Sequence, residues 1–198
     1  MADTGGNDDC DHDARLLHQV ARGDLRALER LFARYQRPVY QLALGVTRDA
    51  QTAEEVLQDT FYRLYTHAAR LDGTQPLLPW LYRVAVNLSY NQARRRHWIE
   101  PLHALAERLR VPARRMPEHI AEQHELQALV RATLDALSPN YRAVLVLHYM
   151  HEYSIQEIAE ILDCPEGTIK SRLHHARKLL KEQLERRYGG AAILPDQI

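Results

Sequence analysis

Cysteine is scarce in this chain of 198 residues: Cys10 and Cys164 are the only 2, too few for a framework of disulfide bonds. No apolar run approaches the roughly 20 residues of a membrane-spanning helix, and no charged-then-apolar N-terminus is typical of a signal peptide. No Gly-rich phosphate loop, nucleophile elbow or internal repeat is present. These absences predict a cytoplasmic protein, with no membrane span and no cofactor.

Charge is balanced over the whole chain but unevenly distributed. Lys and Arg together number 26, and so do Asp and Glu. Residues 1–14 contain five aspartates and no basic residue, whereas residues 94–96 are three consecutive arginines. Net charge therefore argues neither for nor against a nucleic-acid partner, and only local clusters of charged residues can indicate one.

Residues 154–184 predict two helices joined by a tight turn. Ser154 and Glu157 form an S-x-x-E capping box at the start of the first helix. We expect Gly167 to take a positive φ in the turn and Thr168 to cap the second helix. An apolar stripe predicts the buried side of that second helix: Ile169, Leu173, Ala176, Leu180 and Leu184.

The opposite side of this second helix is basic. Residues 167–187 contain seven basic and two acidic residues. A short helix, a tight turn and a basic second helix are typical of a helix-turn-helix whose second helix enters the DNA major groove. A helical hairpin with a solvated charged face remains the alternative.

Two further helices offer candidate binding faces. A T-x-x-E pattern, Thr52 to Glu55, predicts the start of a helix whose outer side bears Glu55, Gln58, Asp59 and Tyr62. Such a row is more often solvated surface than a binding site. The helix that follows residues 71–76 turns Arg83, Asn87, Tyr90 and Arg94 outward, just before Arg95 and Arg96. Guanidinium, amide and aromatic groups on one face suit DNA with exposed bases, although a polar helix face is the alternative.

The fold class is predicted to be all-α, with two helical domains joined by a flexible linker. Residues 1–14 form a disordered acidic tail, 15–97 a first domain, 98–124 the linker, 125–188 a winged-helix-like four-helix domain with the helix-turn-helix, and 189–198 a C-terminal tail. An extended linker would let the two domains contact DNA sites on the order of 70 Å apart.

Eleven histidines do not form a metal-binding pattern. His148 and His151 occur as H-x-x-H-E, whereas zinc hydrolases use H-E-x-x-H. We therefore expect no metal site and no catalytic residue. A metallohydrolase stays a distant alternative, which would contain stoichiometric zinc.

Four motifs, in this order, resemble the extracytoplasmic-function class of bacterial sigma factors: QDTFYRLY, WLYRVAVN, SPNYRAVLVLHY and SIQEIAEIL followed by PEGTIKSRLHHAR. The resemblance covers residues 16–97 and 125–187. It implies that the first domain is sigma region two, that the second is region four, and that the protein is not an enzyme. Such a factor directs core RNA polymerase to promoters and melts the minus ten element.

The resemblance also implies partners and site residues. Core polymerase would be held at the clamp of its largest catalytic subunit and at the flap of its second subunit, and an anti-sigma protein is a further candidate partner. Residues 71–79 would join the minus ten surface. The predicted polymerase-binding residues are Glu55, Gln58, Asp59 and Tyr62. The predicted minus ten residues are Trp80, Arg83, Asn87, Tyr90, Arg94, Arg95 and Arg96. The predicted minus thirty-five residues are Lys170, Ser171, Arg172, His174, His175, Arg177 and Lys178.

Two positions depart from the family pattern. His175 stands where the family often has Arg, and the loop reads GTQPLLPW, which is richer in proline than usual. The preferred promoter sequence is therefore not predicted. The main alternative function is a dimeric helix-turn-helix regulator that binds duplex DNA without contacting core polymerase.

Overall fold

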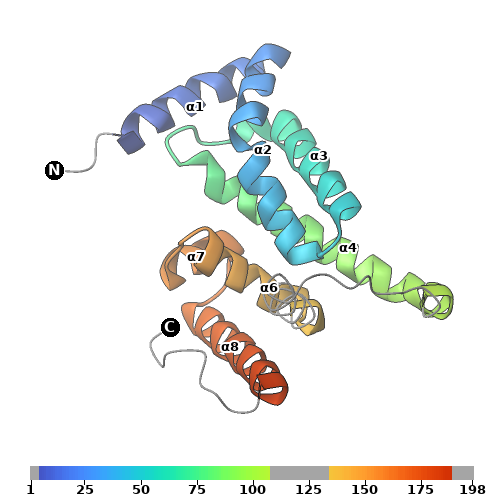
Figure 1. Cartoon of the computed structure of the whole chain (residues 1–198). Helices are drawn as coiled ribbons and strands as arrows, with labels where there is room; N and C mark the ends of the chain where they lie inside the picture. The colour runs from blue at the N-terminus through green and yellow to red at the C-terminus, as the bar shows by residue number, and fades with distance from the viewer. Residues whose placement is uncertain (1–4, 108–133, 189–198) are drawn as a thin grey trace, which may run out of the picture.

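A computed structural model describes residues 5–107 and 134–188 of the chain (Figure 1). Within these ranges every regular element is helical and no strand is present, so the all-α prediction is confirmed. The elements are α1 (Gly5–Ala21), α2 (Leu25–Thr47), α3 (Ala50–His67), η1 (Ala68–Arg70), α4 (Leu77–Glu107), α6 (Pro139–Leu145), the π-helix η2 (Val146–Met150), α7 (Ile155–Leu162) and α8 (Glu166–Tyr188).

The first domain is a bundle of α2, α3 and α4, with α1 across one end (Figure 1). Leu31 and Leu42 of α2, Leu64 of α3 and Leu81 of α4 are fully buried in its core. Apolar residues at helical spacing bury one side of each helix in this way, and the opposite sides remain for binding.

The predicted disordered tail is wrong from Gly5 onward, because α1 begins there. Asp13 lies inside this helix and is only 4% exposed. Its carboxylate accepts a hydrogen bond from Arg34 Nη1 at 2.9 Å and another from the Tyr35 hydroxyl. A buried carboxylate is tolerated when it is paired in this way. Residues 1–4 lie outside the described part of the chain.

Aspartate side chains cap the starts of both α2 and α3. Gly23 has a φ of 87° and Asp24 caps α2, as a Gly-Asp break suggests. The T-x-x-E box at Thr52 is wrong, because the N-cap of α3 is Asp49. The Asp49 carboxylate accepts hydrogen bonds from Thr52 N at 2.8 Å and Thr52 Oγ1 at 2.7 Å, so Thr52 already lies within the helix.

Helix α4 is longer than the sequence pattern indicates. It continues to Glu107, so residues 98–107, which were assigned to the flexible linker, extend the last helix of the first domain. The remainder of the predicted linker and the first predicted helix of the second domain fall on residues 108–133, which lie outside the described ranges.

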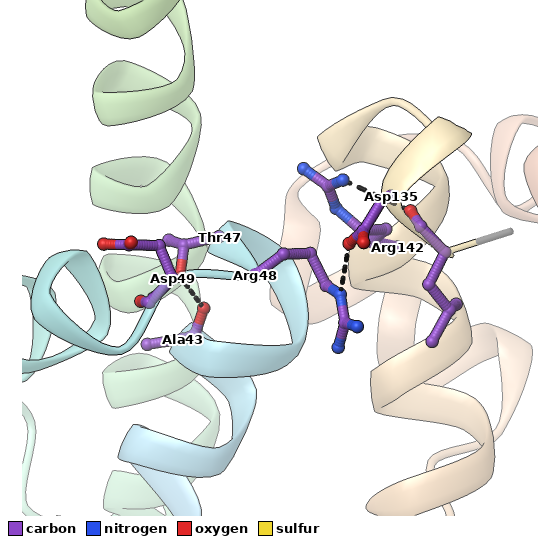
Figure 2. Close-up of polar contacts among 7 residues, drawn as sticks. Ala43, Thr47, Arg48, Asp49, Asp135 and Arg142 are labelled. Carbon is purple, nitrogen blue, oxygen red and sulfur yellow. Dashed lines mark hydrogen bonds and ion pairs between the residues drawn. The ribbon is translucent and has the colours of Figure 1, made fainter. Parts of the chain in front are cut away.

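The two domains are in contact rather than separate. Figure 1 shows α6 and α7 beside α4, with α8 on their far side, and α6 also contacts α2. Figure 2 shows Arg48, the residue that ends α2, reaching Asp135 at an Nε to Oδ1 distance of 2.8 Å. Arg142, largely buried, donates to the Leu134 carbonyl at 3.2 Å and thereby fixes the segment that bears Asp135.

Candidate nucleic-acid and polymerase interfaces

The helix-turn-helix is formed by α7 and α8. The predicted capping box is confirmed: Glu157 N donates to Ser154 Oγ at 3.3 Å, and Ser154 N donates to Glu157 Oε2 at 2.8 Å. These hydrogen bonds lower the pKa of Glu157. A carboxylate that is ionised and bonded here stabilises the start of α7.

The turn itself differs from the prediction. Asp163, not Gly167, takes the left-handed conformation, with a φ of 51°. Helix α8 begins at Glu166, and Thr168 N already donates to the Pro165 carbonyl at 2.9 Å. The expectation that Thr168 caps the helix is therefore wrong. Asp163 can end α7 in the left-handed conformation, because Asp tolerates it better than most residues. With α8 beginning at Glu166, the turn is shorter than the sequence indicates.

Helix α8 packs its predicted stripe against the rest of the second domain. Ile169, Leu173 and Ala176 are buried and Leu180 is half-buried, while the side chain of Leu184 lies outside the described part. The opposite side is therefore free. Five of the predicted minus thirty-five residues are exposed: Lys170, Ser171, His174, His175 and Lys178.

Two of the predicted residues contact tyrosines, and the two arginines among the predicted residues are half-buried. Arg177 is half-buried, and its Nε donates to the Tyr149 hydroxyl at 2.7 Å. The ring of His175 lies 4.8 Å from that of Tyr141, centroid to centroid. Arg172 is half-buried. Sequence reasoning missed the two tyrosines, since nothing in the local pattern pairs them with α8.

Helix α4 carries the predicted minus ten residues on one side. Arg83, Asn87, Arg94 and Arg95 are exposed, whereas Trp80 and Tyr90 are half-buried. The side chain of Arg96 lies outside the described part. The Tyr90 hydroxyl has no hydrogen-bond partner among the described residues. Burial raises the pKa of Tyr90 to about 12, and the nearby Arg172 opposes that shift.

The second domain contacts this same side of α4. Arg83 Nε donates to the Ile161 carbonyl at 3.0 Å, and Arg83 Nη2 donates to the Glu160 carbonyl. The structure thus places the end of α7 against the predicted minus ten surface of α4. The sequence offered no sign of this contact, because the acceptors are main-chain carbonyls.

The predicted polymerase-binding row lies on the outer side of α3. Glu55, Gln58, Asp59 and Tyr62 are all exposed, and Tyr62 retains 68% of its surface. The two oxygens of Glu55 each lie 3.5 Å from an amide nitrogen, one of Gln51 and one of Gln92. The row is therefore an open face with an acidic part and an aromatic part.

No group of three or more His, Cys, Asp or Glu side chains in these ranges has the arrangement of a metal site. No described helix is long and apolar enough to cross a membrane.

Two family models match the chain, one on each domain. The model for Sigma-70 region 2 matches residues 31–99, and the model for Sigma-70, region 4 matches residues 127–180. The chain is 31% identical over 176 residues to the ECF RNA polymerase sigma factor SigW of Bacillus subtilis, which covers 85% of this chain and 94% of that relative. It is 30% identical over 189 residues to the RNA polymerase sigma-H factor of Pseudomonas aeruginosa, with coverage of 88% and 95%.

Solved structures agree with these matches. The chain is similar to CnrH in its complex with the cytosolic domain of CnrY, with a TM-score of 0.61, 27% identity, and coverage of 88% of this chain and 98% of CnrH. The fold is also that of the sigma factor RpoE of Bartonella quintana, solved with the anti-sigma factor NepR, at a TM-score of 0.60, 23% identity and coverage of 79% and 96%. The chain therefore belongs to the extracytoplasmic-function class of the sigma-70 family, whose members are RNA polymerase sigma factors and not enzymes.

Proposed function

We propose that this sigma factor divides promoter recognition among three helices. Helix α3 binds core RNA polymerase, α4 captures the opened minus ten element, and α8 reads the minus thirty-five element. The observation that carries the proposal is the exposed side of α8, with Lys170, Ser171, His174 and Lys178 opposite a buried apolar stripe. Since the polymerase works in the cytoplasm, we infer that this protein acts there too.

In this proposal the lysines and arginines bind phosphates, and the smaller polar groups distinguish bases. Lys170 and Lys178 lie on the same exposed side as Ser171 and His174, which suits a helix in the major groove. Each phosphate contact adds affinity that falls with salt concentration.

On α4 we propose the same division between phosphate-binding and base-binding side chains, here for single-stranded DNA. Arg83 supplies a planar cation for phosphate or base, Asn87 an amide for a base edge, and Tyr90 a ring for stacking. We propose that this side holds one base outside the stack, at a cost of a few kcal/mol for unstacking that the contacts offset.

The acidic row of α3 supports the proposed polymerase contact. Asp59 and Glu55 are exposed beside Tyr62, so a basic partner surface could pair with the carboxylates while the ring is buried. An anti-sigma protein that covers both DNA-binding sides is a further partner proposed from family membership alone.

Run-off transcription with purified core polymerase tests the proposed function. We expect transcripts that start at defined promoters only when this chain is added. Ser171→Glu should weaken binding to duplex promoter DNA about tenfold or more, because it sets an acid against the phosphates. Gln156→Glu is the matched control, since it adds the same charge at an exposed position of α7. DNA binding without any new start site would instead identify a dimeric regulator.

A further inference from the structure

The outer side of α2 bears a stripe of arginines that the proposed function leaves unused. The arginine stripe consists of Arg26, Arg30, Arg34 and Arg37, which follow one another at separations of four, four and three residues and are all exposed. Residues at these separations lie on one side of a helix. Leu31 and Leu42, which are fully buried in the core, lie on the opposite side of α2. The stripe therefore points away from the interior of the bundle.

This arrangement is unfavourable for α2 by itself. Arg26 and Arg30 are like charges four residues apart, and so are Arg30 and Arg34. Such pairs repel one another and destabilise a helix. Glu29 is the one acid of α2, and no ion pair joins it to any residue of that helix. An unfavourable local choice of this kind indicates a binding role more than a solvated surface.

Helix α8 shows how this chain treats exposed charges elsewhere. Lys170 Nζ lies 3.1 Å from the carboxylate of Glu166, and Lys178 Nζ lies 3.9 Å from that of Glu182. Both pairs join opposite charges four residues apart, which is the favourable arrangement. The arginine stripe of α2 has no such compensation within its own helix.

One position of the stripe already holds an oxyanion. Arg34 Nη1 donates to Asp13 Oδ1 of α1 at 2.9 Å. Arg26, Arg30 and Arg37 form no ion pair with any residue in the described ranges. A guanidinium binds phosphate as readily as carboxylate, through paired N–H donors. Three exposed guanidiniums of the stripe therefore remain for an external anion.

The side chains around the stripe favour double-stranded DNA as the partner. No aromatic side chain of α2 is exposed, so the stripe offers no ring on which an unpaired base could stack. Leu25, at the first position of α2, is 64% exposed but lies off the stripe. A protein partner would need an apolar centre with few charges, which these arginines do not provide. Phosphates of a duplex need cations alone.

We propose that the arginine stripe of α2 is a further DNA-binding surface, which holds the phosphate backbone of double-stranded DNA without reading its sequence. From Arg26 to Arg37 the helix rises about 16 Å. A duplex presents a phosphate on each strand about every 3.4 Å of its axis, so several phosphates lie within that span. The inference goes beyond the proposed function, which gives the first domain contacts only to polymerase and to single-stranded DNA. Because α2 packs against α4, duplex held on α2 would adjoin the strand held on α4.

The test is the double variant Arg26→Gln with Arg30→Gln in the full-length chain. Glutamine is nearly as good a helix former as arginine, so α2 should persist, and circular dichroism checks this. The matched control is Arg15→Gln with Arg70→Gln, which removes two exposed arginines outside the stripe, one from α1 and one from η1. Fluorescence anisotropy at several salt concentrations measures affinity for a short random-sequence duplex and for a promoter duplex.

We expect the double variant to bind both duplexes about tenfold more weakly than the wild type. The slope of log affinity against log salt concentration should become less steep by about two, because two phosphate contacts are lost. The control should change both quantities much less, although its net charge is the same as that of the double variant. This difference separates a contact made by the stripe from a general effect of charge.

Three outcomes would overturn the inference. The first is a double variant with the affinity and salt slope of the wild type, and the second is a loss confined to the promoter duplex. The third is unchanged duplex binding together with weaker binding to immobilised core polymerase, which would make the partner a protein. In each case the proposed function stands if the wild type directs core polymerase to defined promoters. If the wild type gives no such transcripts, the proposed function fails whether or not the stripe binds DNA.

Discussion

The α3 and α4 sides of the first domain differ in accessibility. The acidic row of α3 is open, with Tyr62 at 68% exposure, whereas on α4 the adjacent Tyr82 is 1% exposed and Arg83 is bonded to α7. Core polymerase can therefore reach its whole proposed surface. On α4, single-stranded DNA can reach Asn87, Arg94 and Arg95, but it can bind the Arg83 nitrogens only when their hydrogen bonds to α7 are broken. The comparison predicts that changes on α3 act directly on polymerase binding, whereas a change at Arg83 acts on both DNA binding and the contact with α7.

Charge reversal on α3 should have the largest effect of any substitution considered. We expect Asp59→Arg to weaken binding to core polymerase about 100-fold, because an interface charge pair becomes a repulsion. Binding of labelled sigma factor to immobilised core enzyme measures this. The loss should be equal in the wild-type and Arg83→Ala backgrounds, since these side chains of α3 are exposed while Arg83 is bonded to α7.

Glu29→Arg is the control for this prediction, because Glu29 is an exposed acid on α2 outside the row. It should change polymerase affinity little. If the Asp59→Arg chain binds core enzyme normally, the row on α3 is ordinary solvated surface. The comparison between a polymerase-binding side of α3 and a DNA-binding side of α4 then no longer holds.

Arg83→Ala should have a smaller effect that depends on the contact with α7. Loss of a contact to single-stranded DNA would by itself lower affinity about tenfold. The substitution also removes the donors to Glu160 and Ile161, which frees this part of α4, so the net fall should be about threefold. Fluorescence anisotropy with a short random-sequence single strand measures it, and a full tenfold fall would mean that the contact of Arg83 with α7 does not limit access to α4.

The local parts of the fold could be predicted from the sequence. The capping box of Ser154 and Glu157 and the stripe of α8 depend on residues three to eight positions apart, and both are confirmed. The same S/T-x-x-E rule failed at Thr52. There the side chain of Asp49 had already started the helix, and that residue precedes the pattern by three positions.

The long-range parts could not be predicted. Helix α1 extends into the acidic tail because Asp13 meets Arg34 and Tyr35, 21 and 22 residues away. The contact between the domains includes a hydrogen bond from Arg83 to a main-chain carbonyl 78 residues away. Every residue has such a carbonyl, so the sequence does not indicate which one accepts. One usable sign was Gly45, an isolated glycine within an otherwise helical pattern, which often marks close packing, here against Val146 of the second domain.

Acid should moderately weaken the contact between the two domains. His151 Nδ1 lies 2.7 Å from the hydroxyl of Tyr82 on α4, and burial lowers the pKa of His151 below its ordinary value of 6.5. Separation of the domains would expose the ring, so the separated state binds the proton more tightly. The contact is therefore favoured above about pH 7 and weakens as the pH falls through the ordinary value toward the lowered one. We expect the radius of gyration, measured by small-angle scattering, to rise between about pH 7.5 and about pH 5.5.

His151→Gln is the control for the pH prediction. Glutamine keeps a hydrogen-bonding group near Tyr82 but does not titrate, so the pH dependence of the radius of gyration should flatten. If the radius of gyration of the wild type is constant over this pH range, the environment of His151 does not change when the domains separate.

The smallest effect should come from the second domain alone. Tyr149→Phe removes the hydroxyl that accepts from Arg177 Nε at 2.7 Å but keeps the ring, whose centroid lies 5.5 Å from the guanidinium carbon. Arg177 should be less well positioned on the flank of α8, and affinity for duplex promoter DNA should fall about threefold. Because this contact lies within the second domain, the loss should be the same in the wild-type and Arg83→Ala backgrounds. A loss that differs between them would mean that the contact of Arg83 with α7 also alters α8, and the contrast between an open side and a partly covered side would then have to include the recognition helix.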